Sequence, residues 1–119
     1  MRIEIRGRNV EVTDELREMV RKRFQRLGRQ VSDLATLDVE LTEERNPRIA
    51  DNQVAEATFY LKGVTLRARE CSPEMSHSIC ELADDVRRQV KKHRELLRKR
   101  SRTRRLVDQM RGRPAQLHP

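Results

Sequence analysis

The side chains of this sequence that could do chemistry are mostly arginines and lysines, and they gather toward the C-terminus. Residues 87–113 hold 13 of the 27 Lys and Arg residues and only two acids, Glu95 and Asp108, which gives a net charge of +11. Residues 1–86 hold the other 14 bases and 17 acids, which gives −3. Clustered cations gain affinity for a polyanion because binding releases condensed counterions. The distribution favours a nucleic-acid partner, and the alternative is a solubilising tail.

The densest run covers Arg87 to Arg105, where 11 of 19 residues are basic and Glu95 is the only acid. The negative end of a helix dipole stabilises cations only near the last turn, by roughly 0.3–1 kcal/mol each. It does not account for a run this long, so polyanion binding is the interpretation we favour. In a helix, six of these cations point away from the apolar stripe: Arg87, Arg88, Lys91, Lys92, Arg94 and Arg98.

A second set of cations follows the first expected helix, opposite its apolar side. Glu15 and Glu18 dilute this set, so taken alone it fits a solvated face as well as a binding surface. If both helices pack on the same side of the sheet, the two basic faces form one continuous wall. The set comprises Arg17, Arg21, Lys22, Arg26 and Arg29.

Sulfur and imidazole groups are few and dispersed. Cys71, His77, Cys80 and His93 lack the close pairing of a structural zinc site, so we expect no metal. Cys71 precedes an expected helix start, where thiols can be reactive, but an inert cysteine is the simpler reading. No Gly-rich phosphate loop, paired-carboxylate constellation or nucleophile elbow occurs. We therefore expect no enzyme activity and no cofactor.

Aromatic residues separate the classes of nucleic-acid binder. The chain has no Trp, one Tyr and two Phe, and only Tyr60 is expected on the open face of the sheet. Readers of single-stranded bases need stacking platforms there. The sequence therefore predicts contacts to the phosphates and riboses of structured RNA.

Alternating polar and apolar residues predict the strands that position these groups. The first strand covers residues 2–8, and the other three lie near 37–42, 55–62 and 64–69. Gly63 marks the turn between the last two. Each strand has one apolar side, so both helices must cover the same face of the sheet.

Two helices complete the pattern. The first follows Thr13, a good N-cap, and the second begins at Ser72-Pro73-Glu74, where a hydroxyl precedes a proline and an acid. We expect the second helix to fade between Arg98 and Arg105. The apolar stripes are Leu16, Val20, Phe24, Leu27 and Val31 in the first helix, and Met75, Ile79, Leu82, Val86, Val90 and Leu97 in the second.

The element order predicts an α+β fold, β-α-β-β-β-α, with a four-stranded sheet and two helices packed on one face. The first two strands should be parallel, joined by a right-handed crossover. We expect one domain over residues 1–100 and a flexible basic tail over 101–119. No apolar run is long enough to span a membrane, and the N-terminus lacks the apolar block of a signal peptide, so we expect a cytoplasmic protein.

Several stretches resemble the ribosome hibernation-promoting factors, also called ribosome-associated translation inhibitors. The most specific is Gly7-Arg8-Asn9-Val10-Glu11-Val12-Thr13-Asp14-Glu15-Leu16-Arg17. Further matches are Asn46-Pro47-Arg48-Ile49-Ala50, Ala55-Glu56-Ala57-Thr58 and Lys91-Lys92-His93-Arg94-Glu95. The resemblance covers about residues 1–100, and it implies the same fold, which is similar to double-stranded-RNA-binding domains.

The resemblance also implies a function. Such proteins bind the decoding cleft of the small ribosomal subunit, overlap the messenger and transfer RNA sites, and idle the ribosome during stress or stationary phase. They contact ribosomal RNA with basic residues of both helices. The matching positions here are Arg21, Lys22, Arg26, Arg29, Arg87, Arg88, Lys91, Lys92, Arg94 and Arg98.

Two departures from the family pattern stand out. Many members have Asp-Met-Tyr at the start of the second helix, where this chain has Glu74-Met75-Ser76. Long members carry a second domain that pairs ribosomes, whereas residues 101–119 read as a basic tail, so we do not expect pairing by this chain.

Two other classes of function compete with the ribosomal one. A general double-stranded nucleic-acid-binding or DNA architectural protein would explain the charge, but the sequence lacks a helix-turn-helix pattern and minor-groove wedge residues. A thiol or metal enzyme built on Cys71 and Cys80 is disfavoured by their spacing. We expect the small ribosomal subunit and its rRNA as partners, with no membrane or small-molecule substrate, and a monomer off the ribosome.

Overall fold

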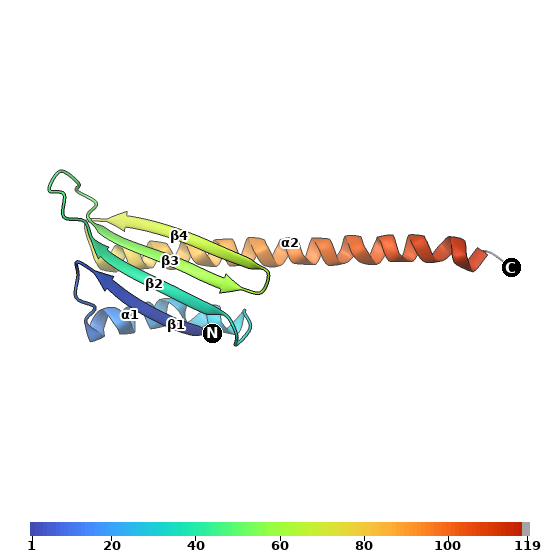
Figure 1. The fold of residues 1–119 in the computed structure, drawn as a ribbon, viewed down its shortest axis with the longest axis horizontal. Coiled ribbons are helices and arrows are strands. Elements are labelled where there is room, and N and C mark those ends of the chain that lie inside the picture. Colours follow the sequence, from blue (N-terminus) through green and yellow to red (C-terminus); the bar gives the residue numbers. More distant parts are fainter. Residues whose placement is uncertain (118–119) are drawn as a thin grey trace. The chain divides into compact units, whose positions relative to one another are not determined.

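The structure is a computed structural model that describes the backbone of residues 1–117 and the side chains of residues 1–110. It divides into one compact unit, Met1–Arg88, and a second that begins at Gln89. The elements along the chain are β1 (Arg2–Arg8), α1 (Asp14–Phe24), the 3-10 helix η1 (Gln25–Arg29), β2 (Thr36–Glu43), β3 (Gln53–Leu61), β4 (Val64–Ser72) and α2 (Met75–Leu117) (Figure 1).

The four strands form one sheet in the order β1-β2-β3-β4. β1 pairs parallel with β2, and the other two pairs are antiparallel. On β2 the side chains of Leu37, Val39 and Leu41 are fully buried, while the residues between them are partly exposed. Only one face of the sheet is therefore covered, as predicted from the alternation.

Helix α1 and the first part of α2 cover that face, behind the sheet in Figure 1. Val20 and Phe24 of α1 are buried, as are Ile79, Leu82 and Val86 of α2. The predicted arrangement, with both helices on one face of a four-stranded sheet, is confirmed.

The first helix is shorter than its apolar stripe suggested. The predicted cap is present, since the Leu16 amide donates to Thr13 Oγ1 at 3.2 Å. The α-helix ends at Phe24, however, and η1 follows it. Residues three apart eclipse each other in a 3-10 turn, which keeps Leu27 in line with Phe24, and both are 1% exposed.

The second helix begins later and ends later than predicted. Ser72 closes β4 instead of standing directly before the helix, and its Oγ accepts from the Glu74 amide at 3.3 Å. The helix does not fade between Arg98 and Arg105 but continues to Leu117, through most of the expected tail. Residues 75–111 contain no glycine or proline and are rich in strong helix formers, so nothing local stops it between Arg98 and Arg105. The domain boundary near residue 100 stays a prediction.

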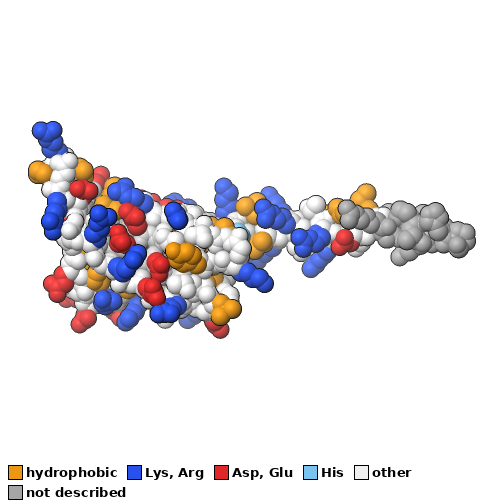
Figure 2. All heavy atoms as spheres, viewed as in Figure 1, with side chains coloured by type: hydrophobic (Ala, Val, Ile, Leu, Met, Phe, Trp, Pro, Cys, Tyr) orange, Lys and Arg blue, Asp and Glu red, His pale blue; other side chains and the backbone are white. Residues whose placement is uncertain are grey.

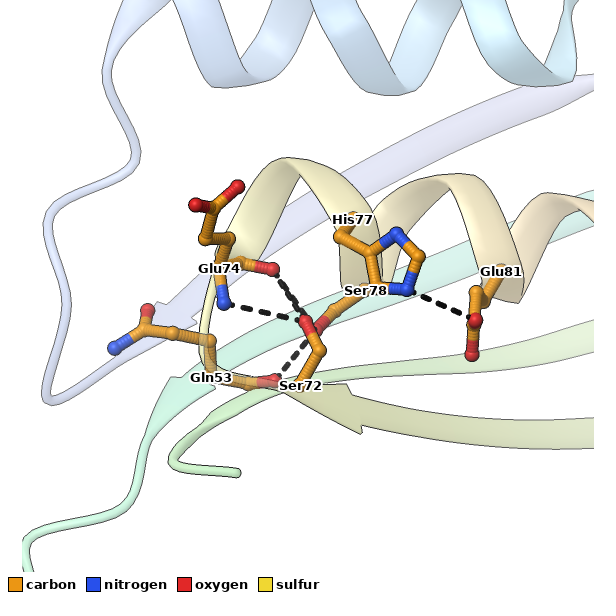
Figure 3. A network of polar contacts seen from close by, with 6 residues as sticks. All are labelled: Gln53, Ser72, Glu74, His77, Ser78 and Glu81. Carbon is orange, nitrogen blue, oxygen red and sulfur yellow. Dashed lines mark hydrogen bonds and ion pairs between the residues drawn. The ribbon is translucent and has the colours of Figure 1, made fainter. Parts of the chain in front are cut away.

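A buried hydroxyl pair anchors the start of α2 to the sheet (Figure 3). Ser78 is fully buried, and its Oγ lies 2.7 Å from both the Gln53 carbonyl oxygen and Ser72 Oγ. Ser72 Oγ also lies 2.6 Å from the Glu74 carbonyl oxygen. One cluster thus joins β3, the end of β4 and the first turn of α2, where buried polar groups must find partners.

A carboxyl pair joins β4 to α2 further along. Burial raises the pKa of Glu70, and so do the charge of Asp85, a hydrogen bond with Asp85 and the charge of Glu81, while Arg88 lowers it. Both Glu70 and Asp85 are partly buried. Ionising Glu70 places its charge in a partly buried position beside other acids, so this contact favours the protonated form of Glu70.

We predict that Ser78→Ala lowers the free energy of unfolding by about 1–2 kcal/mol, because its buried partners lose a hydrogen bond. Ser76→Ala is the matched control: Ser76 is exposed on the same turn, and its loss should change stability by less than about 0.5 kcal/mol. Urea unfolding followed by circular dichroism measures both. Equal losses from the two variants would contradict the anchoring role of Ser78.

We also predict that Glu70→Gln raises the melting temperature at neutral pH. Because the pKa of Glu70 is raised in the folded state, the free energy of unfolding falls as pH rises through that pKa. The neutral amide of Gln does not ionise, so the variant avoids this loss. The gain should vanish near about pH 4, where the native carboxyl is already protonated. Glu18→Gln, on the exposed surface of α1, is the control and should show no such pH-dependent gain. A gain that persists in acid would rule out this cause.

Candidate nucleic-acid interface

The predicted cations of the first helical segment lie in water. Arg21 and Lys22 are on α1, Arg26 and Arg29 are on η1, and all four side chains are exposed. None of them forms a salt bridge with any residue that the structure describes. These four positive charges therefore have no bound counter-charge within the described part of the chain.

The two predicted cations of α2 within the first unit differ from each other. Arg87 is half-buried, pairs with Asp84, and donates from Nε to the Ala83 carbonyl oxygen at 3.3 Å. Arg88 is exposed and lies close enough to Glu70 to lower the pKa of that carboxyl. Arg87 is already engaged within its own helix, so Arg88 is the freer of the two for a ligand.

The second unit carries the remaining predicted cations, Lys91, Lys92, Arg94 and Arg98. All four are exposed, and within the described part of the chain none has a salt bridge. Lys91, Arg94 and Arg98 are spaced three and four apart, so they line one side of the helix. A continuous wall formed with the cations of α1 stays a prediction.

The open face of the sheet behaves differently, because it neutralises its own charges. The register places Arg6, Glu40, Glu56 and Arg69 in one row across the four strands. Arg6 Nη2 lies 3.5 Å from Glu40 Oε2, and Arg69 Nε lies 3.3 Å from Glu56 Oε1. Figure 2 shows the resulting mixture of basic and acidic side chains over the sheet. Such a surface offers a polyanion little net attraction.

Sequence reasoning missed one cation of the same kind. Arg23 is exposed on α1 next to Lys22 and makes no salt bridge with a described residue. These two side chains and Met19 line a shallow groove along α1 whose other end is acidic. Arg23 does not lie opposite the apolar stripe, so helical periodicity does not place it among the predicted cations of this helix. Its exposure depends on how α1 sits on the sheet.

The sulfur and imidazole groups form no site in the described residues. Cys71 is exposed and Cys80 half-buried, and neither is in a disulfide. On the exposed surface of α2, His77 Nε2 lies 3.0 Å from Glu81 Oε1. Within residues 1–110, no three His, Cys, Asp or Glu side chains gather closely enough to hold a metal ion. The absence of a metal requirement stays a prediction.

Across the described part of the chain, no helix combines the length and the apolar character needed to cross a bilayer. The long helix α2 is instead strongly charged. The mean hydropathy of the whole chain is −0.90, which is typical of a polar sequence. The candidate surface is thus a set of exposed cations on helices.

Comparison with known proteins agrees with this fold. Residues 3–98 match the family model described as "Sigma 54 modulation protein / S30EA ribosomal protein". A ribosome hibernation promoting factor of Acinetobacter guillouiae is 30% identical over 101 residues, which cover 81% of this chain and 89% of that protein. The factor of the same name from Escherichia coli K12 is 31% identical over 98 residues, 82% of this chain and 98% of its own length.

One relative is about twice as long as the part that this chain matches. The ribosome hibernation promotion factor of Picosynechococcus is 33% identical over 96 residues, and this chain spans 50% of its length.

Solved structures share the fold. The crystal structure of the Thermus thermophilus Protein Y N-terminal domain superposes with a TM-score of 0.66 at 30% identity, covering 78% of this chain and 99% of that one. A ribosomal subunit interface protein from Coxiella burnetii gives a TM-score of 0.67 at 19% identity, over 80% and 99% of the two chains, which is a likeness of fold alone. Since the family model matches 96 of the 119 residues, including all of the sheet but Arg2 and the starts of both helices, the chain belongs to the S30EA ribosomal protein family.

Proposed function

We propose that this protein is a translation silencer that docks in the decoding cleft of the small ribosomal subunit through the basic faces of its two helices. There it would cover the sites of messenger and transfer RNA during stress or stationary phase. Relatives named as ribosome hibernation promoting factors support the ribosomal partner. A role without catalysis and a cytoplasmic location are part of the same proposal.

One observation carries the docking surface: three cations of the sheet are paired with acids, whereas nine of the ten predicted helix cations have no salt bridge with a described residue. Arg2, Arg6 and Arg69 each have an acidic partner within 3.5 Å. Among the predicted rRNA-binding residues that the structure describes, only Arg87 has one. Unpaired cations bind phosphates without first breaking an internal ion pair, and each contact releases counterions. The helices are therefore the surface we assign to rRNA.

The fold suits this mode of binding. RNA duplexes and structured RNA are recognised largely by shape and by phosphate and ribose contacts. Rigid helices on a sheet hold cations at fixed spacing, whereas loops would have to be ordered on binding. Tyr60 is 45% exposed and is the only aromatic residue exposed in the described chain, so base stacking contributes little.

We predict that reversing three helix cations, Lys91→Glu, Lys92→Glu and Arg94→Glu, weakens small-subunit binding by more than about tenfold and makes its dependence on salt shallower. Arg88 is spared because it offsets the acids around Glu70. The matched control reverses three open-face cations, Arg2, Arg8 and Arg67. Sedimentation with purified small subunits at several salt concentrations measures both.

Equal losses from the two triple variants would indicate diffuse attraction to RNA and contradict docking through the helices. Duplex DNA serves as a competitor in the same assay. If duplex DNA displaces the protein from subunits as effectively as free ribosomal RNA does, a general double-stranded nucleic-acid binder becomes the better description. Far-ultraviolet circular dichroism confirms that each variant folds, since surface changes shift stability by only about 0.5 kcal/mol.

A second prediction concerns the location on the subunit. Small subunits already loaded with messenger RNA and an initiator transfer RNA should bind this protein much more weakly than empty subunits, because the ligands compete for one cleft. Fluorescence anisotropy of the labelled protein measures this. Equal binding to loaded and empty subunits would place the site outside the decoding cleft.

A further inference from the structure

The second unit exposes aliphatic side chains that RNA binding does not explain. Five of them lie within fifteen residues of α2, and each is more than a third exposed. Clustered apolar side chains left in water mark interaction surfaces. They are Leu96 at 44%, Leu97 at 48%, Leu106 at 60%, Val107 at 37% and Met110 at 67%.

These residues follow a seven-residue repeat. If Leu96 is taken as position d, Met110 is also d, Val107 is a, Leu97 is e and Leu106 is g. All five fall on the positions that face a partner helix in a coiled coil. The outward positions b, c and f between them are all polar: Arg98, Ser101, Arg102, Arg105, Asp108 and Gln109. The spacing is therefore that of one helix face built to pack on another helix.

The remaining seam positions specify the charge of that partner. Four positions remain: Lys99 at g, Arg100 at a and Arg104 at e are basic, Thr103 at d is uncharged, and all four side chains are exposed. None has an acidic partner among the residues described. Figure 2 shows basic and hydrophobic side chains close together on this part of α2. A partner with acidic residues at its own e and g positions would complement them.

A second copy of this chain does not fit the seam as a parallel partner. In a parallel pair of identical helices, Lys99 at g would lie opposite Arg104 at e of the other copy. Arg100 would meet its own copy at position a. Like charges placed this way oppose pairing. Phosphate does not fit either, because it gains nothing from a row of leucine, valine and methionine side chains.

We infer that the α2 face spanning Leu96–Met110 docks an acidic amphipathic helix of another protein, which buries the aliphatic seam and pairs with Lys99, Arg100 and Arg104. This surface is separate from ribosome docking in what it recognises, since it needs an apolar stripe as well as negative charge. It also gives the length of α2 a purpose beyond the sheet-covering part of the helix.

The test uses the full chain and a synthetic acidic peptide of about three heptads. The peptide has Leu at d, Ile at a with one Glu opposite Arg100, and Glu at e and g. A scrambled peptide of identical composition has no heptad pattern. Fluorescence anisotropy should show the patterned peptide binding about tenfold more tightly than the scrambled one. The ratio of the two dissociation constants cancels non-specific charge attraction, because both peptides carry the same charge.

Two double variants localise the effect. Leu96→Gln with Val107→Gln should bring the ratio close to one, because it removes apolar seam contacts while keeping good helix propensity. Arg98→Gln with Arg105→Gln, at position f, should weaken both peptides alike and keep the ratio. Both residue pairs are exposed, so the melting temperature of the folded domain should not change in either variant.

Three results would overturn the inference. The first is a ratio near one for the native chain, which would mean a surface that attracts any polyanion. The second is a seam variant that keeps the native ratio. The third is self-association of the native protein in analytical ultracentrifugation that the seam variant abolishes, which would make a second copy the occupant.

Discussion

The structure depends on one constraint: the sheet has a single apolar face. Leu37, Val39, Leu41 and Phe59 all point to that face, and all are fully buried. Fully burying a side chain of this size is worth about 1.5–3 kcal/mol, which no surface interaction in this protein matches. Both helices must therefore lie on the same side, and the hydroxyl cluster of Ser72 and Ser78 sets where the second one starts. Apart from the loops, the surface that faces water is either the other side of the sheet or the outside of a helix.

Those two water-facing surfaces handle charge in opposite ways. On the sheet, cross-strand register brings Arg6 to Glu40 and Arg69 to Glu56, so charges are paired by the same hydrogen bonding that aligns the strands. On the helices, cations follow cations at spacings of three and four, where like charges repel. A folded protein tolerates this repulsion because each exposed pair contributes only a few tenths of a kcal/mol. The uncompensated charge then remains available to a polyanion.

The part of α2 that follows Arg88 adds a second kind of surface. Its aliphatic residues continue a heptad spacing, and its cations occupy both the outward face and parts of the seam. One helix can thus present phosphate-binding charge on one side and an apolar stripe on the other, which are chemically distinct and do not compete for the same residues. The seam cations Lys99, Arg100 and Arg104 are not among the residues assigned to rRNA.

The sequence by itself determined the order of elements, the covered face of the sheet and the cationic faces of the helices, because alternation and helical periodicity depend only on local spacing. It also carried the family resemblance that the comparisons confirm. It misjudged where both helices stop. Packing decides the first end, where Leu27 enters the core through a 3-10 turn, whereas α2 runs on to Leu117 because strong helix formers continue it past Arg105. Only the tertiary structure decided which cations of the sheet are paired. Arg6 engages Glu40 and Arg69 engages Glu56 because strand register brings those partners within reach, whereas the pair of Arg87 with Asp84 lies within one helix and follows from local spacing.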